Sequence, residues 1–451
     1  MAELFEPPFP PPLRSKAGLL RRFVRGWNSW IHTLFAKSYT MKLGRVRLPA
    51  LDLFVVNELG AVAEVLGDDN AWPKHPILTD MLGDLMGGGV FLAGGQEWAD
   101  QRAMMNPAFA HTHLARAFPA MAGGVAAMVA RLGAGGEVDV DPLMTHVTAD
   151  VIFRTLFSQS LGEAEAAAVH EAFNRYQQMA QRSTMLGIYR LPRLGYKRRA
   201  GQAAAAIHGI FEPLIAARLA EARPAEAPPR DILDALIAAR HPRSGAPFTA
   251  AQLRDQVAIL FLAGHETSAS ALCWALYLLA ESPDLQEELY GCVMAATGGA
   301  ALAHAHLKAL EPLRDLMREA LRLYPPVSFL PRAACPGARL RGRALGRRAM
   351  LVVSPWLIQR NPANWPCPHA FDPHRFADPA QAGAAANAFL PFGRGARVCI
   401  GAGFAMQEAV MVLAAVVSAY RLGVAPGFRP EVVSRLTLRP AAGMRLVFRP
   451  R

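Results

Sequence analysis

Cys399 lies in a segment whose composition suits a thiolate that binds metal: Phe392-Gly393-Arg394-Gly395-Ala396-Arg397-Val398-Cys399-Ile400-Gly401. Glycines let the backbone approach a bulky planar group and adopt positive φ. The arginines and the start of the apolar helix expected after Gly401 would hold the thiol as thiolate, the form that binds metal. On this segment alone, a small buried cysteine after a glycine turn remains the alternative.

The cysteine content of the chain limits which metal group Cys399 could hold. The five cysteines are scattered and odd in number, which suggests no disulfide framework: Cys273, Cys292, Cys335, Cys367 and Cys399. Cys399 has no partner at CxxC spacing and no histidine pair nearby. Zinc and iron–sulfur clusters need three or four protein ligands, whereas a haem iron needs one axial thiolate.

A second polar group interrupts a long apolar helix expected over residues 251–279, at Ala263-Gly264-His265-Glu266-Thr267. Polar side chains in the middle of such a helix are costly unless they are used. Gly264 thins the wall of the helix, and Thr267 can bond back to its own helix and open a kink. A helix end with a cap, or a satisfied buried pair, is the structural alternative.

Three further pairings of charged or aromatic residues could serve the same site. Glu319 and Arg322 stand one helical turn apart, just before Pro325-Pro326, and Arg375 follows in Phe371-Asp372-Pro373-His374-Arg375-Phe376. Trp98 and Arg102 stand at i, i+4 and would share one helix face. Each pair is common on helix surfaces and means little in isolation.

Taken together, these segments resemble the motifs of the cytochrome P450 family, in order along most of the chain. The haem loop pattern F-x-x-G-x-R-x-C-x-G matches at Phe392, Gly395, Arg397, Cys399 and Gly401. The patterns A-G-x-[DE]-T, E-x-x-R, P-x-R-F and W-x-x-x-R match at residues 263–267, 319–322, 373–376 and 98–102. One departure is Gln359 before Arg360, where the family often has histidine; this position is expected to be surface-like.

The resemblance implies haem b as cofactor, with Cys399 as the axial ligand of its iron and O2 as co-substrate. It implies that Trp98, Arg102 and Arg397 bind haem propionates, with Arg332 as a further candidate. It implies that Ala263 and Gly264 shape an oxygen groove, that Thr267 holds oxygen and a water there, and that Glu266 relays protons toward Thr267. Glu319, Arg322 and Arg375 would form a buried charge network behind the haem loop, with a structural role.

The expected fold is mainly α with a small β region, the P450 fold, in one haem domain over residues 1–451. A basic amphipathic segment occupies residues 1–38, with Arg14, Lys16, Arg21, Arg22 and Arg25 between apolar residues at helical spacing. The β-rich parts are residues 39–56, read as a hairpin around Pro49, and about 325–360. The central helix over 251–279 and the haem loop with its helix over 392–417 carry the chemistry.

Composition constrains the partners and the compartment. The 451 residues are 52% hydrophobic and 19% charged, with a net charge of +12, but no basic stripe with interleaved aromatics suggests nucleic acid. We expect a docking face for an acidic ferredoxin, reduced by an NAD(P)H-dependent reductase. No apolar run of about 20 residues and no signal peptide is seen, so a cytoplasmic protein is expected. The protein is also expected to be a monomer. The amphipathic segment over residues 13–37 is expected to pack on the core; contact with a membrane surface is the alternative.

The predicted activity is insertion of one oxygen atom from O2 into a lipophilic substrate, by hydroxylation or epoxidation. Fatty acids, terpenoids, steroid-like molecules and polyketides all fit a pocket predicted to be apolar, lined by Leu82, Leu85, Val90, Phe91, Phe261, Val327, Phe329 and Met444. Two alternatives remain: a peroxygenase or isomerase that shares the haem-thiolate centre, and a haem sensor without catalytic activity. Residues 182–199 are expected to form a lid over the entrance.

Overall fold

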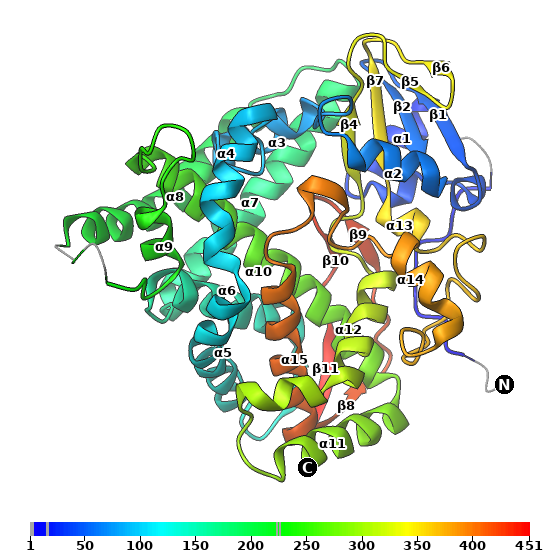
Figure 1. The fold of residues 1–451 in the computed structure, drawn as a ribbon. Helices are drawn as coiled ribbons and strands as arrows, with labels where there is room; N and C mark the ends of the chain where they lie inside the picture. Colours follow the sequence, from blue (N-terminus) through cyan, green and yellow to red (C-terminus); the bar gives the residue numbers. More distant parts are fainter. Residues whose placement is uncertain (1–3, 15–17, 222–223, 225–226) are drawn as a thin grey trace.

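A computed structural model of the chain describes residues 4–14, 18–221, 224 and 227–451, with the side chains of 111–112 and 163–164 left aside. Helices surround the central helix α10, and most strands gather at one corner of the molecule (Figure 1). The helices are α1 (Leu19–Gly26), α2 (Leu59–Gly67), α3 (Ile77–Met86), α4 (Gly95–Met105), α5 (His111–Leu132), α6 (Val140–Phe157), α7 (Glu163–Ile188), α8 (Tyr196–Ala220), α9 (Ile232–Ala238), α10 (Ala250–Ala280), α11 (Pro283–Thr297), α12 (Glu311–Leu323), α13 (Pro355–Ile358), α14 (Ala382–Ala388) and α15 (Ala402–Ala419). The strands are β1 (Leu43–Arg47), β2 (Asp52–Val56), β3 (Gly136–Asp139), β4 (Leu330–Ala333), β5 (Arg339–Leu340), β6 (Arg343–Ala344), β7 (Ala349–Val353), β8 (Tyr420–Val424), β9 (Val432–Ser434), β10 (Leu438–Pro440) and β11 (Arg445–Pro450).

Helix α10 is the axis on which the site is built. It starts at a capping box, in which the Gln252 N–H donates to Thr249 Oγ1 at 3.2 Å and the Thr249 N–H donates to Gln252 Oε1 at 2.9 Å. The helix is buried along most of its length and packs against α6, α8, α12 and α15. The long apolar pattern predicted this element to within two residues at either end.

The main sheet joins segments from the two ends of the chain, in the order β1-β2-β7-β4. Strands β1 and β2 form the predicted hairpin, with Leu43 opposite Val56 and Arg47 opposite Asp52. Strand β2 then pairs in parallel with β7, and β7 pairs antiparallel with β4, which places Arg332 at the edge of the sheet. The smaller sheets are β3-β11-β8, β10-β9 and β5-β6.

The N-terminal amphipathic segment differs from its prediction. Within the described part of residues 13–37 the α-helix covers only Leu19–Gly26, because Ser29 and Trp30 instead bond to Ser434. Phe23 packs on Tyr189, but Leu20 and Val24 are 76% and 63% exposed. The apolar face is therefore only partly covered by the core. Lys16 lies outside the described residues.

Within the part of the chain that the structure describes, three helices are long and apolar enough to cross a membrane by length and composition: α8, α10 and α15. This differs from the expectation that no such stretch exists. Alanine-rich composition raises their hydropathy even where no long run of large apolar residues occurs. In α10, 83% of the most apolar window is buried inside the fold, as befits a core helix, against 28% in α8.

A network of buried charges joins α12 to the segment before the haem loop. Arg322 donates to both carboxylate oxygens of Glu319, at 2.6 and 2.7 Å, and Arg375 Nε donates to the same carboxylate at 3.1 Å. The remaining N–H groups of Arg322 reach the carbonyls of Gln359, Pro368 and Ala370. These three side chains are fully buried, so each charge depends on its partners for solvation.

Gln359 belongs to this network and is not surface-like, which corrects the expectation from the sequence. It is completely buried, and its amide nitrogen donates to the carbonyls of Leu321 and Arg322. Its oxygen accepts the Leu390 N–H at 2.7 Å. The end of α12 is thereby tied to the residues that lead into the haem loop.

Replacing Arg375 by alanine should lower the free energy of unfolding by about 3–5 kcal/mol, because Glu319 would keep a buried charge with one partner fewer. Urea unfolding followed by circular dichroism would measure this change. Arg421→Ala is the matched control, since its partner Glu287 and its own side chain are about half exposed; it should cost less than about 1 kcal/mol. Equal effects of the two variants would contradict the structural role of the network.

Candidate functional site

A cavity of about 530 Å³ separates α10 from the loop that carries Cys399. Ala263, Gly264 and Thr267 line one side, while Phe392, Arg397, Cys399 and Gly401 line the other. Trp98, Arg102 and Arg332 complete the end near the main sheet. The structure therefore brings together nearly all of the predicted site residues around one space.

The backbone of the haem loop explains why glycine occupies position 395. Gly395 has φ +76°, and a Cβ added there would lie 2.3 Å from the carbonyl oxygen of Leu66. Only glycine adopts this conformation against α2 without strain. The Cys399 N–H then donates to the Phe392 carbonyl at 2.9 Å, which closes the loop beneath the thiol.

The polypeptide by itself does not favour the thiolate form of Cys399, contrary to the argument from sequence. The thiol opens to the cavity but lies deep in the protein, and this burial raises its pKa. The Gly401 N–H and the charge of Arg102 lower the pKa, but by less. A bound metal ion is what deprotonates a coordinating thiol outright.

Cationic side chains gather around Asp69 at the sheet end of the cavity. Arg397 reaches the Asp69 carboxylate at 2.6 Å and Arg332 reaches it at 3.1 Å. The Arg397 guanidinium also lies 4.1 Å from the centroid of the Trp98 ring. Arg102 donates to the Val398 carbonyl at 2.9 Å, and Arg332 Nε has no hydrogen-bond partner among the described residues. Several cations thus share one carboxylate. The group keeps a net positive charge and can bind further anions.

Lys74 joins this group, although no sequence motif pointed to it. Its backbone forms a β-bridge with Arg332, and its ammonium group contacts the ring and the carbonyl of Phe91. Burial and, after it, the neighbouring Arg397 and Arg332 lower the pKa of Lys74 to about 7. The pairing of Lys74 with β4 sets the position of this side chain. It joins segments far apart in the sequence, so no local motif predicts it.

The residues 263–267 of α10 face different surroundings. Thr267 faces the cavity, where its hydroxyl donates to the Ala263 carbonyl at 2.6 Å, as the predicted bond within the helix required. Gly264 allows α6 to approach closely, since a Cβ there would lie 3.0 Å from Ile152 Cγ1. His265 is buried against Phe173 and Phe261, away from this groove.

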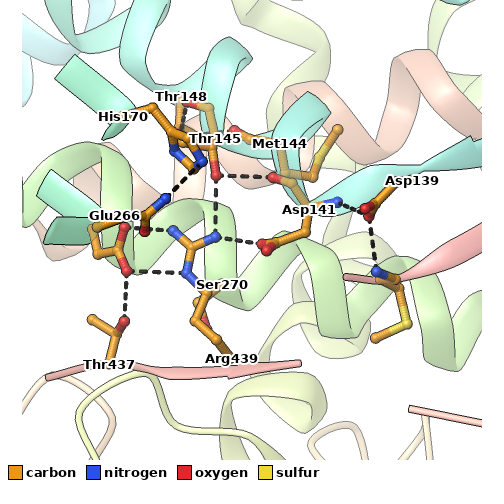
Figure 2. A network of polar contacts seen from close by, with 12 residues as sticks. Asp139, Asp141, Met144, Thr145, Thr148, His170, Glu266, Ser270, Thr437 and Arg439 are labelled. Atoms are coloured by element: carbon orange, nitrogen blue, oxygen red, sulfur yellow. Dashed lines mark hydrogen bonds and ion pairs between the residues drawn. The ribbon is translucent and has the colours of Figure 1, made fainter. Parts of the chain in front are cut away.

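Glu266 belongs to a separate buried network that ties α10 to the strand β10 (Figure 2). Its carboxylate accepts from Arg439 Nε at 3.0 Å, from Thr437 Oγ1 at 2.7 Å and from Gln177 Nε2 at 2.9 Å. Burial alone would raise its pKa, but the charge and hydrogen bonds of Arg439, with smaller effects of His265 and Thr437, lower the pKa of Glu266 to about 2. In this arrangement Glu266 is an ionised anchor, and it would have to leave Arg439 to carry a proton.

The predicted substrate pocket is brought together only in part. Leu82, Val90, Phe91, Val327 and Phe329 line the cavity, together with Ile77, Leu78 and Met81 from the same predicted segment. Leu85, Phe261 and Met444 do not line it. Phe261 packs on Phe211 in the core, and the backbone of Met444 bonds to Asp139 and Val140. Spacing along a helix or strand does not tell which apolar face meets a cavity and which meets the core.

Comparison with known proteins agrees with this arrangement. The family model for cytochrome P450 matches residues 7–446. The chain belongs to the cytochrome P450 family. It is 32% identical to cyclooctatin synthase of Streptomyces melanosporofaciens over 79% of this chain and 78% of that protein. It is 29% identical to pentalenene oxygenase of Streptomyces avermitilis, over 92% of each chain.

The fold of this P450 matches solved structures of the same family. The crystal structure of the cytochrome P450DA heme domain superimposes with a TM-score of 0.83 at 22% identity, over 98% of both chains. The family and the names of the relatives identify the chain as an oxidoreductase that uses haem iron and O2.

The residues of this chain fit a haem. Cys399 offers one thiol to the cavity, without a second metal ligand beside it, and no group of three metal-binding side chains occurs in the described parts of the chain. The unpaired Arg332 Nε and the crowded cations around Asp69 suit the two propionate groups of a haem. The apolar cavity walls suit its flat ring.

A second buried carboxyl group lies on α15, and sequence analysis did not select it. Glu408 is fully buried, and within the described parts of the chain neither of its oxygens has a hydrogen-bond partner in good geometry. Ser268 of α10 lies close enough to lower its pKa. Burial raises the pKa of Glu408 to about 8, so this side chain is mostly neutral at pH 7.

Glu408→Gln should therefore change how stability depends on pH. Between about pH 4.5 and 8 the unfolded chain releases a proton that folded Glu408 retains, so the wild type should lose stability as pH rises through this window. The glutamine variant should lack this loss and become the more stable protein at pH 8, by a few kcal/mol at most. Urea unfolding at pH 5 and pH 8 tests this, with the exposed Glu64→Gln as control. Parallel pH profiles for wild type and Glu408→Gln would contradict a buried neutral carboxyl.

Proposed function

We propose that this P450 binds haem b and inserts one oxygen atom from O2 into a C–H or C=C bond of a lipophilic molecule. The observation that carries the proposal is the cavity that has the Cys399 thiol on one wall and the Thr267 hydroxyl on the other. Terpenoid oxidation by relatives such as pentalenene oxygenase supports a terpenoid-sized substrate, as do the largely apolar walls. Fatty acids and other lipophilic molecules of similar size remain within the same class.

Each side of the cavity has its own task in this proposal. Cys399 would ligate the iron, while Arg102, Arg332, Arg397, Trp98 and Lys74 would hold the propionates. When bound, the haem iron supplies the activation of O2, which consumes two electrons and two protons. Thr267 would orient a water with its free lone pairs, because its own proton is committed to the Ala263 carbonyl. Glu266 would relay a proton only when Arg439 releases it.

Electrons would come from a separate donor, for which we propose an acidic ferredoxin reduced by an NAD(P)H-dependent reductase. The net charge of +12 and Arg394 in the haem loop support electrostatic docking near the thiolate. We further propose that residues 1–451 form one haem domain that acts as a monomer in the cytoplasm. The partly exposed apolar face of α1 leaves peripheral contact with a membrane as an alternative placement.

The first test is the absorption spectrum of the dithionite-reduced, carbon monoxide-bound protein. Thiolate ligation should shift the Soret band strongly to the red, and Cys399→Ser should abolish this shift because serine does not supply a thiolate. Cys367→Ser is a matched control in an exposed cysteine outside the cavity, and it should leave the band unchanged. A red-shifted band that survives in Cys399→Ser would overturn the assignment of the ligand.

Thr267→Ala should separate electron use from product formation. Without the hydroxyl that orients a water, delivery of protons to the reacting oxygen becomes inefficient and peroxide is released. We expect NAD(P)H consumption to persist while the ratio of product to NAD(P)H falls by roughly tenfold or more, within the range of general acid–base effects. Thr267→Ser should keep most of the coupling. Unchanged coupling in the alanine variant would limit Thr267 to shaping the helix.

A further inference from the structure

The charged side chains on the cavity wall fall into two groups. Among the described lining residues, Glu266 is the acidic one, and Arg439 neutralises it. Most of the lining cations belong to the haem loop or to the group around Asp69: Lys74, Arg102, Arg332, Arg394 and Arg397. Arg22 and Arg435 belong to neither, and the proposed haem site makes no use of them.

Arg435 is held in place by its backbone, whereas its guanidinium has no partner. It lies in the turn between β9 and β10, where its N–H donates to the Thr437 carbonyl at 2.9 Å. The adjacent Ser434 accepts from the Trp30 N–H and bonds Ser328 Oγ at 3.1 Å, which anchors the turn. In the described parts of the chain no hydrogen bond or ion pair reaches the half-buried Arg435 side chain.

The residues around Arg435 add further positive charge and do not neutralise the charge of its guanidinium. Burial and, after it, the charge of Arg182 on α7 lower the pKa of Arg435. The Arg182 guanidinium lies 6.0 Å from the Trp27 ring centroid and 5.9 Å from that of Tyr196, again without a carboxylate partner among the described residues. Arg22 on α1 lies near Tyr189, since its charge lowers the pKa of that phenol against the larger effect of burial.

Arg435 and Arg182 differ from the arginines of the two charge networks described above. The buried or half-buried arginines of the two networks described above reach carboxylates, as Arg322 reaches Glu319 and Arg439 reaches Glu266. Like charges placed together in a poorly solvated region repel one another unless an anion joins them. Arginine presents a planar fork of donors that matches a carboxylate in two parallel hydrogen bonds.

We propose, resting on the monooxygenase function above, that the substrate is a lipophilic carboxylate. Its carboxylate binds Arg435, with Arg182 adding positive charge beside it and Arg22 adding positive charge elsewhere on the cavity wall. Its apolar body crosses the cavity toward Thr267 and Cys399. The cations come from α1, α7 and the β9–β10 turn, whereas Cys399 comes from the loop before α15. Fixing the carboxylate among these cations directs oxidation to carbons remote from it.

Binding to the haem-loaded protein tests this proposal without requiring turnover. The ligands are medium- and long-chain fatty acids and a diterpenoid carboxylic acid, each titrated beside its own methyl ester by calorimetry and by the change of the Soret band. The best acid should bind about tenfold or more tightly than its ester, the factor expected for hydrogen bonds to a charged group. Arg435→Met should abolish this preference, Arg435→Lys should keep part of it, and the exposed Arg449→Ala should keep all of it.

The outcomes separate this proposal from the one on which it rests. If esters bind as tightly as every acid, or if Arg435→Met keeps the preference for acids, the carboxylate site is overturned. The red-shifted carbon monoxide spectrum of each variant shows that fold and haem are intact, so loss of acid binding in Arg435→Met is then a loss of recognition. If the wild type itself lacks that spectrum, the monooxygenase proposal fails first and takes the substrate proposal with it.

Discussion

The ionised carboxylate of Glu319 is the group on which the geometry of the site depends most. It has no access to solvent, so Arg322 and Arg375 must stay in place to stabilise it, and the segments that carry them must stay with them. Through Gln359 the same network fixes Leu390, a few residues before the haem loop. A glutamine amide offers two donors and an acceptor, whereas neutral histidine offers one of each, so Gln359 makes three contacts that histidine would not complete.

Sequence patterns predicted the elements and motifs that depend on residues close together in the chain. The span of α10, the β1–β2 hairpin and the order of the P450 motifs follow from the apolar pattern, strand alternation and fixed spacing. What the patterns missed depends on contacts between distant segments. Asp69 and Lys74 acquire their roles only where Arg332 and Arg397 meet them, and Phe261 and Met444 face the core because of how their elements are rotated. Burial of Gln359 and the early end of α1 have the same origin, since tertiary partners override local preference.

Two buried carboxyl groups, Glu266 on α10 and Glu408 on α15, show how neighbouring residues determine the charge of a side chain. Glu266 and Glu408 are both fully buried, yet one is ionised and the other is mostly neutral. The difference is Arg439, which supplies a countercharge to Glu266, while Glu408 faces only a serine hydroxyl. Helix α10 thus carries a fixed anion and α15 a carboxylic acid, although both side chains are buried. By the same principle, the cations near Arg435 have no countercharge among the described residues.

The parallel pairing of β2 with β7 has a consequence for the order in which the chain assembles. Asp52 pairs with Ala349, about 300 residues later, and residues 5 and 8 are likewise bonded to Phe371 and Tyr324. At usual rates of translation the first hairpin emerges roughly fifteen seconds to a minute before its partner strand exists. A hairpin of two strands is marginal by itself, so its apolar edge stays open while the helices around α10 form. The main sheet, which carries Arg332, is therefore completed late, and a nascent chain stalled before residue 349 would expose an unpaired strand to any neighbour on the ribosome.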